Sequence, residues 1–388
     1  MRILVMLTYY RPHTSGLTIY AERLSRAFAK RGHQVTVLTS QFDPSTPLEE
    51  VSEGVRIVRV PVLFRISKGV FMPKLGRMAT RLVKENDVIQ LHLPQFDAAG
   101  VSLRGRMLRK PTVITYHCDL DMPHDIISQT ANIVINVANW IAALFTHRFV
   151  AYTEDFRDHS PYLSRNKQKV KVIQPPVVMP KAAIADVEQF GKKHSVEDHY
   201  PIIGMATRFA TEKGVEVLLE SLPSVIDKYP NAKVLYAGTY QNVMGEKKYF
   251  DRLYPVIEKY EKKGQWEFLG ILTPKEMAMF YPNLDMLVIP SLNSTESFGL
   301  VQIEAMINGT PCIASALPGV RQPVYQHEMG KVVPIGDHQA LSEAILEVAD
   351  HKENYLRDPE PIREHYNPEI VAEAYEKLFI EIDRELTQ

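Results

Sequence analysis

Short apolar runs alternate with longer amphipathic stretches along the whole chain. In the first half, the apolar runs predict strands at 2–8, 35–39, 55–60, 87–92, 111–116, 147–152 and 169–173. The stretches between them predict helices at 17–31, 72–85, 97–109, 126–145 and 154–163. Continuous Val/Ile/Leu strands separated by helices are typical of a parallel sheet that is covered on both faces.

The same alternation restarts after the proline-rich connection QPPVVMP. Further strands are predicted at 202–207, 233–237, 266–269, 285–289, 311–315 and 331–333, with helices at 214–228, 246–262, 274–281, 299–308, 338–350 and 368–386. This pattern predicts an α/β chain of two doubly wound Rossmann-like domains, 1–177 and 178–367, with the C-terminal helix (about 368–388) packing back onto the first. Ligands bind beyond the carboxyl ends of strands in such sheets, so we expect a site in a cleft between the two facing edges.

The composition of the chain argues against several classes of function. The chain has 388 residues, of which 45% are hydrophobic and 23% charged, and its formal net charge of -1 gives no bulk attraction to nucleic acid. Its two cysteines have no metal-ligand or disulfide-framework spacing and suit a reducing cytoplasm. The most apolar stretch, 126–145, contains Gln129, Asn132, Asn136 and Asn139, so we interpret it as a mostly buried helix and not as a membrane span.

The segment LDMLVIPSLNSTESFGLVQIEAMINGTPCIASA, residues 284–316, carries the strongest chemical signal. A strand ends at Pro290, a polar loop follows, and a helix begins near Gly299. The unpaired N–H groups and the positive dipole end of that helix suit a phosphate. Glu296 and Glu304, eight positions apart, suit sugar hydroxyls as hydrogen-bond acceptors. Taken singly, each glutamate would be read as a solvated residue of the helix or of its first turn.

Residues 296–315, ESFGLVQIEAMINGTPCIAS, resemble the E-x7-E signature of glycosyltransferase family 4, the retaining enzymes of GT-B fold. Other segments match that family in the right order: YYRPHTSGLTIYAERLSRAFAKRGHQVTVLTS, TYHCDL, GMATRFATEKGVEVLLES, FLGIL and LPGVRQPV. The resemblance extends over nearly the whole chain. The E-x7-E segment together with RFATEKG is highly specific, whereas each glycine-rich piece alone is weak.

The resemblance implies a donor site in the second domain. Arg208 and Lys213, which follow its first strand, would grip the donor diphosphate and stabilise it as a leaving group without a metal ion or other cofactor. Glu304 would bind the ribose and Glu296 the transferred sugar. Backbone N–H donors are expected around Phe298, Gly299 and Leu300. The alternative for Arg208 and Lys213 is that they are ordinary surface charges.

In the first domain, the family usually has two glycines in the first loop, and this chain has Ser15-Gly16. We expect Gly16 to lie close to the donor, and Ser15 can be an ordinary helix N-cap. The resemblance implies that His117 positions and polarises the transferred sugar. Asp119 and Asp121 form a D-x-D pair. This pair lies outside the donor domain, so we reject it as the donor's metal site and predict that Asp119 contacts the acceptor.

Residues 54–84 contain no acidic residue. The basic segment 56–84 within them holds Arg56, Arg59, Arg65, Lys68, Lys74, Arg77, Arg81 and Lys84, and RGRMLRK at 104–110 adds charge. Phe64, Val70, Phe71, Met72, Leu75 and Met78 are interleaved with these charges. The pattern fits a solvated helix face over core residues. It fits equally a patch that rests on an anionic membrane surface or an anionic acceptor.

The sequence therefore predicts a cytoplasmic retaining glycosyltransferase, peripheral on the inner face of the membrane. It would move a sugar from a UDP- or GDP-linked donor to a hydroxyl of a glycan or lipid-linked acceptor, with no nucleic-acid partner. Catalysis would rest on positioning and on electrostatic support of the leaving group. Two alternatives stay open: another GT-B enzyme such as a nucleotide-sugar epimerase, and a non-enzymatic nucleotide-sugar-binding subunit.

Overall fold

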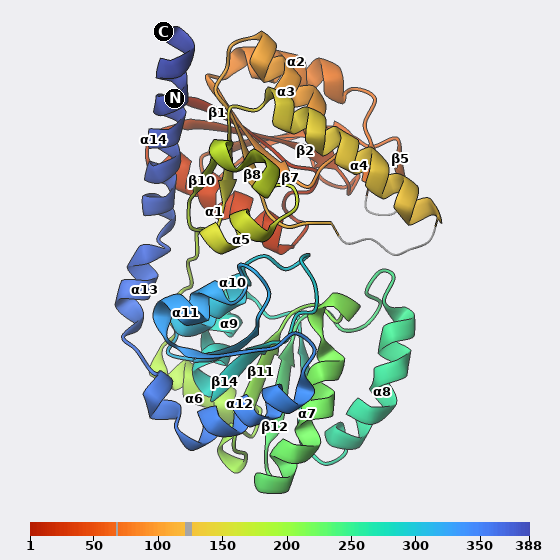
Figure 1. Cartoon of the computed structure of the whole chain (residues 1–388), viewed down its shortest axis with the longest axis vertical. Helices are drawn as coiled ribbons and strands as arrows, with labels where there is room; N and C mark the ends of the chain where they lie inside the picture. The colour runs from red at the N-terminus through yellow and green to blue at the C-terminus, as the bar shows by residue number, and fades with distance from the viewer. Residues whose placement is uncertain (67–68, 121–125) are drawn as a thin grey trace. The chain divides into compact units, whose positions relative to one another are not determined.

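The computed structural model describes residues 1–66, 69–120 and 126–388, and side chains throughout these ranges except at 66 and 126–131. The chain divides into two compact units. The first contains Met1–Val177 and Tyr366–Gln388, and the second contains Val178–His365. Each unit is built around its own sheet, which is entirely or almost entirely parallel (Figure 1).

The sheet of the first unit has the strand order β10-β9-β8-β7-β1-β2-β4-β3. Its strands are β1 Arg2–Met6, β2 Gln34–Gln41, β3 Glu49–Ser52, β4 Val55–Pro61, β7 Val88–Leu93, β8 Thr112–Tyr116, β9 Arg148–Ala151 and β10 Val170–Val172. Only β3 runs antiparallel to its neighbour. A separate antiparallel pair is formed by β5 Phe64–Ile66 and β6 Gly69–Phe71.

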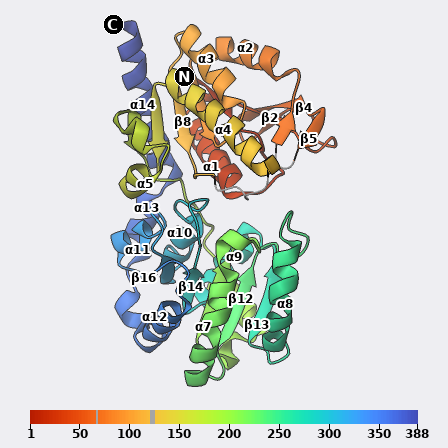
Figure 2. The same cartoon turned by 45° about the vertical axis from the view of Figure 1, so that its right-hand side comes forward.

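Helices cover both faces of this sheet. They are α1 Gly16–Lys30, α2 Leu75–Glu85, α3 Ala98–Met107, α4 Ile126–Phe145, α5 Glu154–His159 and α14 Pro368–Thr387. The helices α2, α3 and α4 pack side by side and share one hydrophobic core with the strands (Figures 1 and 2). The C-terminal helix α14 packs against α1, where Tyr20 and Tyr375 share a buried 2.7 Å hydrogen bond. The two ends of the chain are thereby joined in one unit.

The sheet of the second unit has the strand order β13-β12-β11-β14-β15-β16, and all its pairs are parallel. Its strands are β11 Ile202–Ala206, β12 Lys233–Ala237, β13 Trp266–Gly270, β14 Met286–Ile289, β15 Cys312–Ser315 and β16 Gly330–Val333. Its helices are α6 Ile184–Lys193, α7 Val215–Lys228, α8 Lys247–Glu261, α9 Pro274–Phe280, α10 Leu300–Met306, α11 Gln322–His327, α12 His338–Asp350 and α13 Pro359–His365. Side chains of α7, α8 and α12 share one hydrophobic core with the strands.

The predicted strands and long helices agree with the structure to within a few residues. The interpretation of 126–145 as a mostly buried helix was wrong. The helix α4 has these bounds, but its described part exposes a series of large apolar side chains, among them Trp140 at 65% exposure.

Candidate donor-binding site

Strand order fixes where a ligand can bind in the second unit. Its first strand, β11, pairs with β12 on one side and with β14 on the other. The strands β12 and β13 extend the sheet on one side of β11, and β14 continues it on the other side. A ligand site is therefore expected beyond the carboxyl ends of β11 and β14, where the strand order switches. Residues 207–214 follow β11 and residues 290–299 follow β14. These two loops contain the cations and the first glutamate that the sequence singled out.

Buried residues hold the first of these loops. Phe209 is fully buried against the rings of Tyr249 and Phe250, which fixes the backbone beside the exposed Arg208. Gly214 has a φ of +67°, and a Cβ at this position would lie 2.1 Å from the carbonyl oxygen of Pro290. The turn that carries Lys213 lies directly against the end of β14, and because of this close approach only glycine fits at position 214.

The second loop brings Glu296 to Lys213. Phe298 is buried at 2% exposure and anchors the loop in the core. Lys213 Nζ donates to Glu296 Oε2 at 2.7 Å, although the two residues are 83 positions apart. The side chains are 14% and 22% exposed, so this ion pair is partly shielded from water. A cation and a carboxylate in contact suit a ligand that carries both a phosphate and hydroxyl groups.

The backbone at Gly299 differs from the expectation in one respect. Its N–H donates to Glu296 Oε1 at 3.1 Å, so it is not free for a phosphate in this state. Gly299 has a φ of +74° and immediately precedes α10, whose first residue is Leu300. The amide of Gln302, which is fully buried, donates to the carbonyl oxygens of Phe298 at 2.7 Å and Val320 at 2.9 Å and so secures the loop.

Glu304 lies inside the unit, on α10. It is 8% exposed, and its Oε2 accepts a 3.0 Å hydrogen bond from the hydroxyl of Tyr281. A carboxylate held in this way has one fixed orientation, which suits the recognition of a pair of hydroxyls. Its proposed contact with a ribose remains a prediction.

Arg208 has a partner that the sequence analysis did not identify. Its guanidinium group forms an ion pair with Glu212, four residues further along the same loop. A diphosphate that binds Arg208 must therefore compete with this carboxylate. Helix-like spacing within RFATEKG could have suggested the pair.

In the first unit, the structure separates the roles of Ser15 and Gly16. Ser15 is the N-cap of α1, has an extended backbone, and accepts a hydrogen bond from the Thr18 N–H at 3.2 Å. A serine therefore fits here without strain, as the N-cap interpretation predicted. Gly16 is exposed, and a Cβ there would meet no atom of the described residues within 4 Å, its own chain neighbours and helix backbone aside. No contact with the described residues therefore requires glycine at this position.

His117 follows β8 and is 7% exposed. Its Nε2 lies 2.8 Å from Nδ1 of His92, and its Nδ1 is hydrogen bonded to the Tyr152 hydroxyl. Burial, and to a lesser extent His92, lowers the pKa of His117 well below its usual value. The ring is therefore neutral and has partners at both nitrogens. This arrangement suits a positioning role better than proton transfer.

Asp119 is 9% exposed, and its Oδ1 accepts hydrogen bonds from the Tyr116 hydroxyl at 2.9 Å and the Ser160 hydroxyl at 2.6 Å. Burial raises the pKa of this carboxyl above its usual value. Asp119 thus connects two parts of the first unit, and a contact with the acceptor stays a prediction. Asp121 lies outside the described residues.

The basic segment 56–84 is less uniform than its sequence suggests. Arg59 is 3% exposed and forms an ion pair with Glu50, so it belongs to the interior. Arg56 and Arg81 form ion pairs with Glu49 and Glu85. Within the described residues, the basic side chains of the segment without an ion pair are Arg65, Lys74, Arg77 and Lys84. Lys68 lies outside the described residues.

The apolar residues of this segment also include both buried and exposed side chains. Met72 and Leu75 are each 8% exposed, which fits the alternative of core residues beneath a solvated helix face. Phe71 is 50% exposed and stacks on Phe64 with ring centroids 4.9 Å apart.

In the described part of the chain, no helix is sufficiently long and apolar to cross a membrane. Nor does this part contain a group of three or more His, Cys, Asp or Glu side chains arranged to hold a metal ion.

Two family models match the chain. The model "Glycosyltransferase Family 4" matches residues 14–179, and the model "Glycosyl transferases group 1" matches residues 186–360. The phosphatidyl-myo-inositol mannosyltransferase of Mycobacterium leprae is 25% identical, over 98% of this chain and 96% of its own length. The alpha-monoglucosyldiacylglycerol synthase of Streptococcus pneumoniae is 23% identical, over 92% of this chain and 81% of its own length.

Among solved structures, Alr3699/HepE from Anabaena in complex with UDP matches with a TM-score of 0.70. It is 18% identical, and the match covers 100% of this chain and 98% of that one. The fold and the family models together define a glycosyltransferase enzyme of the GT-B fold. The chain belongs to glycosyltransferase family 4.

Proposed function

We propose that this enzyme transfers a sugar, with retention of anomeric configuration, from a UDP- or GDP-linked donor to an acceptor hydroxyl. The ion pair between Lys213 and Glu296 carries this proposal. In the donor complex, Lys213 and Arg208 face the diphosphate and Glu296 accepts hydrogen bonds from the transferred sugar. Glu304 holds the ribose, and the N–H groups at the start of α10 complete the phosphate site.

Transfer takes place on one face of the sugar. The bond between the anomeric carbon and the diphosphate oxygen breaks, the acceptor oxygen bonds to the same carbon, and its proton passes to the leaving diphosphate oxygen. Two fixed cations stabilise the charge that develops on that diphosphate, so no metal ion is needed. The neutral His117 positions and polarises the sugar, and Gly16 leaves room for the donor.

A lipid-linked acceptor, in preference to a soluble glycan, is supported by two relatives, a phosphatidyl-myo-inositol mannosyltransferase and an alpha-monoglucosyldiacylglycerol synthase, whose names contain a lipid. The unpaired side chains of Arg65, Lys74, Arg77 and Lys84 would attract the first unit to an anionic leaflet. We propose that the enzyme is cytoplasmic and binds peripherally to the inner face of the membrane through these charges.

Turnover of a panel of UDP- and GDP-sugars, with and without lipid acceptors, tests the transferase proposal. We expect slow hydrolysis of one donor and faster consumption of it once a suitable acceptor hydroxyl is present. Release of an epimerised free sugar together with UDP would favour the epimerase alternative. Binding of a nucleotide sugar without any turnover, across the whole panel, would favour the non-enzymatic subunit.

A further inference from the structure

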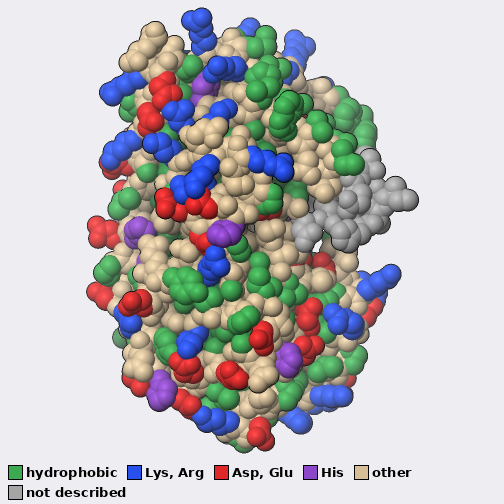
Figure 3. Space-filling view, in the orientation of Figure 1, with side chains coloured by type: hydrophobic (Ala, Val, Ile, Leu, Met, Phe, Trp, Pro, Cys, Tyr) green, Lys and Arg blue, Asp and Glu red, His purple; other side chains and the backbone are tan. Residues whose placement is uncertain are grey.

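The helix α4 has an apolar face that nothing in the described chain covers. Its sequence, IISQTANIVINVANWIAALF, contains no charged residue. Ile133, Val137, Trp140 and Leu144 are 64%, 51%, 65% and 57% exposed. Their spacing of four, three and four places them in one line along the helix. Figure 3 shows hydrophobic side chains gathered where α4 runs. Contiguous exposed apolar surface of this kind usually marks an interaction site.

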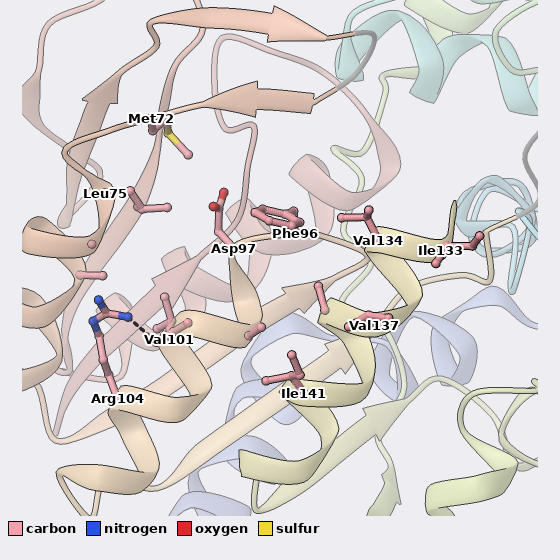
Figure 4. Close-up of a pocket in the computed structure, with 15 residues that line it drawn as sticks. Met72, Leu75, Phe96, Asp97, Val101, Arg104, Ile133, Val134, Val137 and Ile141 are labelled. Carbon is pink, nitrogen blue, oxygen red and sulfur yellow. Dashed lines mark hydrogen bonds between the residues drawn. The ribbon is translucent and has the colours of Figure 1, made fainter. Parts of the chain in front are cut away.

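A groove of about 490 Å³ lies beside this face, between α2, α3 and α4. Met72 and Leu75 line one side of the groove, and Val137 and Ile141 line the other (Figure 4). Val137 belongs both to the groove and to the exposed line, so the two surfaces are continuous. The volume lies within the range of about 300–1,000 Å³ that is usual for small-ligand sites.

The charge around the groove is mainly positive. Arg104 lines it, Lys74 is the N-cap of α2 and Arg77 lies in its first turn, and α2 forms one wall of the groove. None of these three side chains forms an ion pair with any residue that the structure describes. Asp97 is the one acidic residue between positions 88 and 118, and its carboxyl group lines the groove. Burial raises the pKa of Asp97 to about 6.

We propose that the exposed face of α4 enters the acyl region of an anionic lipid leaflet and that the groove takes up one alkyl chain of a lipid. A face without charge, next to unpaired cations, complements a bilayer whose interior is apolar and whose surface is negative. Trp140 belongs to this face, and tryptophan is common on the apolar side of helices that lie in a membrane surface. The proposal deepens the membrane attachment put forward above and does not depend on sugar transfer.

Trp140 is a natural reporter of insertion. The chain has two tryptophans, and the other, Trp266, is 2% exposed in the second unit. We expect the emission of Trp140 to shift to the blue with vesicles of phosphatidylglycerol and phosphatidylcholine. It should be quenched when their acyl chains are brominated, whereas pure phosphatidylcholine vesicles should have little effect. The variant Trp140→Phe, which retains Trp266, should show neither response.

Substitutions then separate insertion from electrostatic attraction. The triple variant Ile133→Ser, Val137→Ser and Leu144→Ser changes exposed side chains and should weaken vesicle binding by at least about tenfold. A matched control, Ile271→Ser, changes a residue that is 74% exposed in the second unit and should leave binding unaltered. Circular dichroism of each variant reports on folding. Vesicle binding without quenching, and unaffected by the triple variant, would overturn insertion while retaining the electrostatic attachment.

The groove is tested with monomeric dihexanoyl phosphatidylglycerol, below its micelle concentration. Ala99, the second residue of α3, lines the groove, and Ala99→Phe should fill it and weaken binding of this lipid by about tenfold or more. Ala185→Phe makes the same change at the second residue of α6 and should have no effect. Equal affinity in both variants, or no binding to the wild-type protein, would overturn the assignment of the groove. Donor hydrolysis is measured in the same variants, so that a failure of the groove assignment can be distinguished from a failure of the transferase proposal.

Discussion

Replacing Lys213 by alanine tests the donor site most sharply. The change removes the Nζ that donates to Glu296 Oε2 at 2.7 Å and leaves that carboxylate with the Gly299 N–H as its other partner. The alanine creates no cavity in the core, since Lys213 lies on a part-exposed turn. We therefore expect a folded protein that has lost its shielded cation.

The loss of rate follows from the role of that cation. Removing one preorganised electrostatic contact to a developing charge typically costs about 10²–10³ in kcat, or about 2.7–4 kcal/mol of transition-state stabilisation. Lys213 is only 14% exposed, so water replaces it poorly, and a loss toward the upper end of that range is expected. Arg208 is more exposed and already bound to Glu212, so Arg208→Ala should cost less.

The assay is initial-rate turnover at saturating donor, with the melting temperature measured on the same samples. Lys262→Ala is the matched control, because it removes one lysine of the same unit that is 70% exposed and paired with Glu258. Its turnover should equal that of the wild type. Turnover of Lys213→Ala within about twofold of the control, at an unchanged melting temperature, would refute the reasoning.

Other consequences can be measured directly. Glu296→Gln should impair transfer more than binding of the free nucleotide diphosphate, whereas Glu304→Gln should weaken both; calorimetry that finds diphosphate binding abolished in Glu296→Gln would reverse these roles. Activity should persist in excess chelator, and a complete loss that Mn²⁺ or Mg²⁺ restores would establish a metal requirement. Burial lowers the pKa of His92 to about 3 and that of His147 to about 4. Below about pH 6.5, these two histidines therefore bind more protons in the unfolded chain than in the folded protein. The free energy of unfolding should then fall by roughly 1.4 kcal/mol per pH unit for each histidine as the pH decreases from about 6.5 toward these pKa values. If urea unfolding of the protein shows no decrease in the free energy of unfolding of the first unit between about pH 6.5 and pH 5, the burial of these histidines is contradicted.

Hydrophobic periodicity predicted most of the fold, because buried parallel strands are continuous apolar runs. It missed β3, Glu49–Ser52, whose sequence EEVS lies at an exposed sheet edge and has no such run. It also missed the three-residue strands β5 and β6. For α4, the apolar composition predicted burial, but composition alone cannot distinguish a core helix from one that presents an apolar face outward.

The site was predicted in its residue types but not in its contacts. The approach of Lys213 to Glu296 depends on β11 lying beside β14, which no local pattern encodes. His92 was overlooked because a histidine within the run VIQLHL looks like an ordinary core position. The pairing of β7 with β8 is what brings His92 to His117.

Proton NMR of the reaction product tests the central claim most directly. The reaction contains an α-linked nucleotide-diphosphate sugar, chosen from the donor panel, and the acceptor that accelerates its consumption. The account predicts that the sugar is attached to the acceptor oxygen and that the one-bond coupling between its anomeric carbon and proton is that of the α configuration. A product with the β configuration, or a donor whose sugar never reaches an acceptor, would contradict it.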